Sequence, residues 1–154
     1  MSRENVDLVR SLQVGPDVDL NDLFHRDDEA AAEASAADYS PVFTEDFECV
    51  FHGLSSEPRR GVLGMRDAWL DWLEPWETYR AEIETLVDAG DKVLLLSRDF
   101  GSRTGMASEV ELFASAVWTV RDGRVARAEF FTDRPAAYAA AGLEPNASSS
   151  SPSR

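Results

Sequence analysis

The fold is decided by residues 77–132, which read ETYRAEIETLVDAGDKVLLLSRDFGSRTGMASEVELFASAVWTVRDGRVARAEFFT. Strand-forming residues recur here in four runs, Glu77–Val87, Lys92–Arg103, Glu109–Val120 and Arg124–Thr132. An Ala-Gly-Asp turn separates the first two runs and an Arg-Asp-Gly turn separates the last two. Short turns that contain glycine join neighbouring antiparallel strands, so the stretch predicts a bent antiparallel meander.

A helix with aromatic residues is predicted immediately before the meander, over residues 63–74. Its apolar residues, which include Trp69 and Trp72, recur at helical spacing on one stripe, and Pro75 ends the pattern. Such a helix can lie across the inner face of a curved sheet. Helix and sheet would then enclose a pocket.

The remaining elements are shorter. In chain order they are predicted as helices at Arg3–Leu12, Leu20–Phe24 and Asp27–Tyr39, paired strands at Phe47–His52 and Glu57–Gly61, and a helix after Asp133 that ends at Gly142. Asp27 or Asp28 is expected near the start of its helix, and Asp133 is expected to cap the last one. We expect a single domain over residues 1–143 and a disordered Ser/Pro-rich tail over residues 144–154.

Composition excludes several classes of function. The 154 residues carry a formal net charge of −14, with 29 acidic against 15 basic residues, which disfavours a nucleic-acid partner. No apolar run approaches the roughly 20 residues of a membrane span, so no membrane partner is expected. The single Cys49 excludes an internal disulfide and fits a reducing cytoplasm. His25 and His52 have no partners at ligand spacing, and we predict neither a metal site nor a cofactor.

The order of these elements resembles the SnoaL-like branch of the nuclear transport factor 2-like superfamily. The motifs that carry the resemblance are Gly61, Gly64, Met65, Arg66 and Trp69 at the aromatic helix, residues 121–125 in the last hairpin, and residues 129–133 and 140–143 at the end. The likeness covers about residues 3–143. It implies an α+β, cystatin-like fold, a cone-shaped curved antiparallel sheet with N-terminal helices over its concave face. The superfamily includes steroid isomerases, epoxide hydrolases, polyketide cyclases, dehydratases and proteins with no known activity, so the fold alone does not settle the function.

The same resemblance places His52 near the position of the general-base Asp of the steroid isomerases. Other parts of that site have no counterpart, because Ala116 stands where an oxyanion-stabilising acid would be needed. In the epoxide hydrolase pattern the acid would fall at Phe130, which cannot transfer a proton. Neither of these two activities is expected.

Side-chain alternation along strands makes Asp99 the carboxylate best placed to reach the cavity, provided that Ala116 also faces inward. His52 and Asp99 would then be the catalytic residues, as base and acid, or with Asp99 orienting the imidazole. The alternatives are an idle His52 at a strand end and a solvated Asp99 paired with Arg98 or Arg103.

Aromatic side chains are expected to line the pocket. The predicted lining residues are Trp69, Trp72, Trp76, Tyr79, Ala116, Trp118 and Phe130. Such walls suit a planar or polycyclic small hydrophobic ligand. Two functions stay open. The chain is a SnoaL-like small-molecule-binding domain of undetermined activity, or it is a cofactor-free isomerase, cyclase or dehydratase that acts on a small hydrophobic carbonyl compound.

A homodimer is also predicted. Phe113, Val117 and Phe131 would face outward and form an apolar strip on the convex face of the sheet. The superfamily commonly buries this face against a second copy.

Overall fold

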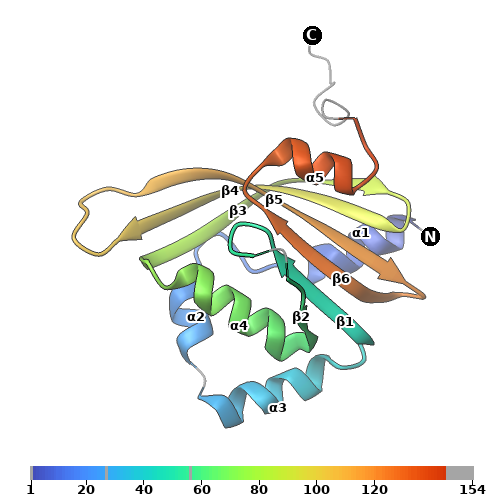
Figure 1. Ribbon diagram of the computed structural model, residues 1–154, viewed down its shortest axis with the longest axis horizontal. Helices are drawn as coiled ribbons and strands as arrows, with labels where there is room; N and C mark the ends of the chain where they lie inside the picture. The colour runs from blue at the N-terminus through green and yellow to red at the C-terminus, as the bar shows by residue number, and fades with distance from the viewer. Residues whose placement is uncertain (1, 27, 56, 145–154) are drawn as a thin grey trace.

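A computed structural model describes residues 2–26, 28–55 and 57–144 of the chain (Figure 1). In chain order the elements are α1 (Ser2–Ser11), α2 (Leu20–Arg26), α3 (Glu29–Tyr39), β1 (Phe43–Phe51), β2 (Arg59–Arg60), α4 (Gly61–Leu73), β3 (Trp76–Ala89), β4 (Lys92–Arg103), β5 (Val110–Arg121), β6 (Arg124–Phe131) and α5 (Arg134–Ala140). The four predicted long strands and the aromatic helix are confirmed, and the α+β class with them.

The strands form one sheet in the order β2-β1-β6-β5-β4-β3. Strands β3 to β6 pair antiparallel, as the meander predicts. The predicted curved sheet is nevertheless mixed, because β1 pairs parallel with β6. A parallel pair needs a long crossover, and α4 with strands β3 to β5 supplies it in the sequence between β1 and β6.

A tight hairpin turn and a bulge help to shape the meander. Asp122 and Gly123 have φ angles of 54° and 79°, the positive values that a tight two-residue hairpin requires. The register between β3 and β4 shifts between Ile83 and Thr85, and such a bulge bends and twists a strand. The bend gives the sheet the concave face that holds the site.

Helices cover the two faces of the sheet unequally. Figure 1 shows α2, α3 and α4 on one side of the sheet, α1 behind β6, and α5 on the side opposite to α2, α3 and α4. The main core lies on the first side and contains Phe47, Cys49 and Phe51 of β1. Asp28 caps α3 as expected, because its side chain accepts a hydrogen bond of 2.9 Å from the amide of Ala31. Residue 27 and most of the predicted tail lie outside the described residues.

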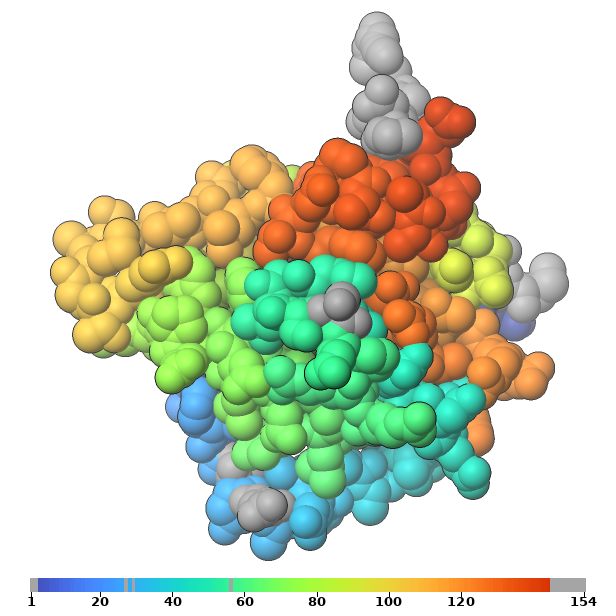
Figure 2. All heavy atoms as spheres, in the orientation of Figure 1, coloured from blue at the N-terminus to red at the C-terminus, as the bar shows by residue number. Residues whose placement is uncertain are grey.

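The last helix corrects two expectations. Asp133 occupies the N-cap position of α5, but its side chain makes no capping hydrogen bond. Val117 and Phe131, predicted as parts of an exposed strip, are buried beneath α5 in a second cluster. Only Phe113 is exposed, at 57%, and the Arg134 guanidinium lies 5.5 Å from its ring centroid. The chain thus covers most of the proposed dimer strip itself. Figure 2 shows α5 lying over this face, with the β4–β5 hairpin projecting beyond it.

None of the helices within the described residues is long and apolar enough to cross a membrane.

Candidate functional site

Two adjoining cavities lie between the helices and the concave face of the sheet. The inner chamber, of about 160 Å³, is enclosed by α2 and α4 on one side and by strands β3 to β6 on the other. The outer vestibule, of about 300 Å³, is bordered by α2, α3, the start of α4 and Phe43 of β1. They share six lining residues, Leu12, Val14, Leu23, Phe24, Met65 and Trp118. A ligand could therefore extend from one cavity into the other.

Aromatic rings make up much of the inner chamber's wall. They are Phe24, Phe51, Trp69, Trp72, Tyr79, Trp118 and Phe130, whereas the ring of Phe131 packs beneath α5 and against His52. The rings of Phe51 and Phe130 stack with centroids 5.0 Å apart, and Trp69 meets both at steep angles of 85° and 74°. Six of the seven predicted lining residues, Ala116 included, border this chamber.

Trp76 is the exception. It packs behind Tyr79, with ring centroids 5.5 Å apart, and does not border either cavity. Its indole occupies the space above Gly101, where an added Cβ would come within 2.5 Å of the ring. Trp76 therefore supports the wall of the chamber from outside.

Asp99 is the polar centre of the inner chamber and is only 4% exposed. The Tyr79 hydroxyl donates a 2.7 Å hydrogen bond to its Oδ2, and the Ser97 hydroxyl donates a 2.9 Å bond to its Oδ1. The alternative setting, a solvated carboxylate paired with arginine, is wrong. Arg98 pairs instead with Glu111, and Arg103 lies over the ring of Trp76.

Burial raises the pKa values of both Asp99 and Tyr79. It raises the pKa of the Asp99 carboxyl, and the hydrogen bonds from Tyr79 and Ser97 and the charge of Arg134 act in the opposite direction. Burial, followed by the neighbouring Asp99, raises the pKa of the Tyr79 phenol far above its ordinary value. Tyr79 therefore remains a hydrogen-bond donor at neutral pH, while Asp99 is the group able to exchange a proton.

His52 has a different setting from the one expected. Its Nε2 lies 3.2 Å from Glu129 Oε2, and its ring stacks on Phe131 with centroids 4.4 Å apart. The imidazole does not border the inner chamber, and the side chains that hydrogen-bond Asp99 are those of Tyr79 and Ser97. The structure thus does not bring the two predicted catalytic residues together. The catalytic role predicted for His52 stays a prediction.

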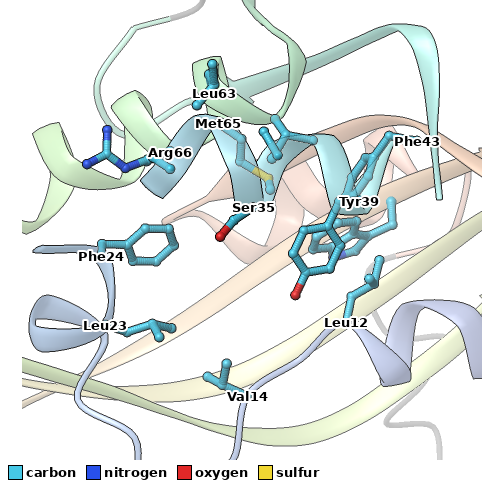
Figure 3. A pocket seen from close by; sticks show the side chains of 14 residues that line it. Leu12, Val14, Leu23, Phe24, Ser35, Tyr39, Phe43, Leu63, Met65 and Arg66 are labelled. Atoms are coloured by element: carbon cyan, nitrogen blue, oxygen red, sulfur yellow. The ribbon is translucent and has the colours of Figure 1, made fainter. Parts of the chain in front are cut away.

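The outer vestibule was not foreseen from the sequence. Figure 3 shows the hydroxyls of Ser35 and Tyr39 pointing toward its open centre, between Phe24 and Leu12, while Arg66 points away. The Ala-rich composition of α3 gave only its helical propensity, and no local pattern marked which of its faces would border a cavity. Phe51 was also missed, although alternation along its strand places it inward.

Some buried polar atoms at the site have no protein partner. Within the described residues, the indole nitrogen of Trp118 is such an atom, and Trp118 lines both cavities. Buried polar groups are nearly always hydrogen-bonded, so such atoms indicate a place for water or a ligand. The part of the chain that the structure describes holds no group of His, Cys, Asp and Glu suited to a metal ion.

Solved structures share this fold at low sequence identity. A proposed SnoaL-like polyketide cyclase from Jannaschia sp. CCS1 is 18% identical over 84% of this chain and 85% of its own, with a TM-score of 0.56. TerC, co-crystallised with polyporic acid, is 18% identical over 73% of this chain and 90% of its own, with a TM-score of 0.52. A hypothetical protein from Catenulispora acidiphila with a ketosteroid isomerase-like fold, in complex with trimethylamine, is 17% identical over 76% of this chain and 94% of its own, with a TM-score of 0.50.

These likenesses show the fold alone. No protein with a curated description matches the sequence significantly. The model of the SnoaL-like domain matches residues 20–128, more than half of the chain. The chain therefore belongs to the SnoaL-like domain family.

Proposed function

We propose that this SnoaL-like domain binds a small ring-containing organic molecule in the inner chamber, with Asp99 and Tyr79 as its polar anchor. The observation that carries the proposal is a buried, hydrogen-bonded carboxyl–phenol pair in an otherwise largely apolar, aromatic cavity. Ligand sites commonly combine apolar walls with a few polar groups that fix orientation.

The size of the chamber limits which ligands can fit. Its volume of about 160 Å³ is close to that of an engineered cavity of about 150 Å³ that binds benzene. A single ring is therefore a better match to the inner chamber than the polycyclic ligand expected from the sequence. The outer vestibule, of about 300 Å³, offers room for a substituent and two hydroxyls to hydrogen-bond it.

Two further observations support binding. The unpartnered Trp118 indole N–H lies on a wall that the two cavities share, where a ligand oxygen would satisfy it. Two proteins with a similar fold have crystal structures with small organic molecules, trimethylamine in one and polyporic acid in the other.

A substitution that partly fills the inner chamber tests the proposal. Ala116, 3% exposed, lines the inner chamber, so Ala116→Leu would fill part of it. Ala37→Leu on the exposed side of α3 is the matched control. A panel of single-ring compounds is screened by ligand-observed NMR, and affinities are measured from quenching of tryptophan fluorescence. We expect Ala116→Leu to weaken binding at least about tenfold and Ala37→Leu to leave it unchanged. Binding that survives in Ala116→Leu would contradict the proposal.

A second candidate function is acid–base catalysis on the bound molecule. It is favoured by the raised pKa of Asp99, which brings the carboxyl closer to the range in which a group both accepts and returns a proton. Asp99 would remove a proton from a carbon next to a ligand carbonyl and return it elsewhere, and Tyr79 would orient the carboxylate. Hydrogen–deuterium exchange at such carbons, followed by NMR, tests this. Loss of exchange in Asp99→Asn supports catalysis, and equal exchange contradicts it.

We retain the predicted homodimer as a proposal, with the exposed Phe113 as its centre in place of the whole apolar strip. Around it, the convex face carries ion pairs such as Arg98–Glu111 and Arg80–Glu109. Light scattering at micromolar concentration should show a dimer that Phe113→Asp dissociates. A wild-type monomer would contradict the proposal.

A further inference from the structure

We propose that the inner chamber selects organic cations, namely an ammonium group carried on a single ring, with Asp99 as the counter-ion. The inference rests on the proposed function, since it names the chemical class of ligand that the same chamber would take. It is carried by the charges, the hydrogen bonds and the aromatic walls of the chamber.

Charge is the first step. Among the described residues that border the inner chamber, Asp99 alone has an acidic or basic side chain, and Tyr79 stays neutral. None of these residues has a cationic side chain that could form an ion pair with an anionic ligand. Arg134, the nearest cationic influence on Asp99, bonds the backbone oxygen of Ser97 and pairs with Glu84. An ammonium group inside the chamber would therefore meet one opposite charge and no like charge.

The hydrogen bonds form the second step. Each oxygen of Asp99 faces a hydroxyl, from Tyr79 at 2.7 Å and from Ser97 at 2.9 Å. Donors on both oxygens match an ionised carboxylate, which only accepts. Two neutral hydroxyls do not neutralise a buried charge, and a buried charge without a counter-ion is costly. A cationic ligand would supply the missing charge.

The aromatic wall is the third step. In a chamber of about 160 Å³ a cation would lie against the aromatic wall, and cation–π attraction acts within ~6 Å of a ring centroid. Phe51, Trp69 and Phe130 meet at both shallow and steep angles, so their π surfaces face different directions. Quaternary ammonium groups are recognised by aromatic walls of this kind. The formal net charge of −14 would further concentrate cations near the protein.

The competing reading is a neutral Asp99 acid that donates a hydrogen bond to a ligand carbonyl. The two readings differ in how affinity depends on pH. Burial raises the pKa of Asp99, while Tyr79, Ser97 and Arg134 oppose the rise, and no other charged side chain of the described wall faces it. Affinity for a permanently charged cation should therefore increase as pH rises through that pKa. Affinity for a carbonyl ligand should fall over the same interval.

The test compares phenyltrimethylammonium with tert-butylbenzene, which has the same shape without the charge. Affinities are measured by fluorescence quenching and by chemical shifts of the chamber's aromatic rings. We expect the wild type to favour the cation at least about tenfold near pH 8. Asp99→Asn should remove this preference and leave tert-butylbenzene binding within about twofold. Asp67→Asn, at a carboxylate 65% exposed on α4, removes the same charge from the surface and should leave the preference intact.

Each outcome decides the inference. Equal or tighter binding of the neutral compound by the wild type would overturn the cation preference while supporting the proposed binding function. A preference that persists in Asp99→Asn would overturn Asp99 as the counter-ion. If neither compound binds, the cation inference fails, and the wider panel against Ala116→Leu separately decides the proposed function. Should Asp99→Asn fail to fold, the pH dependence of phenyltrimethylammonium binding in the wild type decides, and a decrease with rising pH refutes the inference.

Discussion

Replacing Tyr79 by Phe would test the anchor of the inner chamber, because it removes one hydroxyl and keeps the ring. Tyr79 is 1% exposed, and its ring makes edge contacts with Trp69, Trp72 and Trp76 that Phe would retain. The lost interaction is the 2.7 Å hydrogen bond to Asp99. A hydrogen bond to a charged group contributes roughly 1.5–3 kcal/mol. We expect the free energy of unfolding to fall by about 2 kcal/mol near pH 8, and the melting temperature by about 4–8 °C.

The fall in the free energy of unfolding caused by Tyr79→Phe should depend on pH. Burial raises the pKa of Asp99 above its ordinary value of 3.8, so the folded state binds this proton more tightly than the unfolded chain. The contribution of Asp99 to stability therefore declines as pH rises through the raised pKa and is constant above it. Tyr79→Phe removes an interaction that lowers this pKa, so the decline extends further in the variant. The difference between wild type and variant should be largest near pH 8. Toward pH 4 the neutral form of Asp99 gains in both proteins, because the pKa is raised, and the difference should shrink to about 1 kcal/mol or less.

Urea unfolding followed by tryptophan fluorescence measures these differences. Tyr39→Phe is the matched control, because Tyr39 is 48% exposed and its hydroxyl should contribute less than about 0.5 kcal/mol. Equal losses for Tyr79→Phe near pH 4 and pH 8 would refute a bond to an ionised Asp99. A loss no larger than that of Tyr39→Phe at both pH values would refute the bond itself.

Three further predictions concern residues outside the chamber. Gly101→Ala should destabilise the fold by about 1–3 kcal/mol in urea, since its Cβ would lie 2.5 Å from the Trp76 ring, and unchanged stability would mean that Trp76 sits elsewhere. Burial raises the pKa of the Cys49 thiol to about 12, so native protein should resist a thiol reagent near pH 8 and react only as fast as it unfolds; immediate labelling would contradict the buried position. His52→Ala, which loses a hydrogen bond to Glu129 and a ring stack, should leave ligand affinity within about twofold, whereas a large loss of turnover would support the catalytic role predicted from the sequence.

Local patterns predicted most of the meander. Strand β4 has the bounds expected from the sequence, Lys92–Arg103, because neighbouring residues determine both the Gly-containing turns and the period-two alternation. The inward assignments of Leu95, Ala116 and Trp118 are confirmed for the same reason. The inner chamber could therefore be outlined from the sequence, including Asp99.

Long-range pairing could not be predicted in this way. Strand β1 begins at Phe43, four residues before the expected start, and pairs with Val125 of β6 across most of the domain's sequence. No local residue pattern specifies such a partner. The position of α5 is equally non-local. Its buried Ala137 and Tyr138 pack on Val117, so helix and sheet cover apolar surface that each would otherwise expose.

The alternation of side chains along β1 explains why His52 faces away from the chamber that it was predicted to enter. Phe47, Cys49 and Phe51 all lie in the main core, so the residue that follows Phe51 must face the other way if the alternation continues. It does continue, because the amide of His52 donates a 2.9 Å hydrogen bond to the oxygen of Phe130, and Phe130 is already the register partner of Phe51. Resemblance to the steroid isomerases placed His52 by counting along a motif, whereas the strand's own period places Phe51 in the chamber. Backbone geometry decides between the two, since moving the imidazole inward would carry Cys49 and Phe51 out of the core.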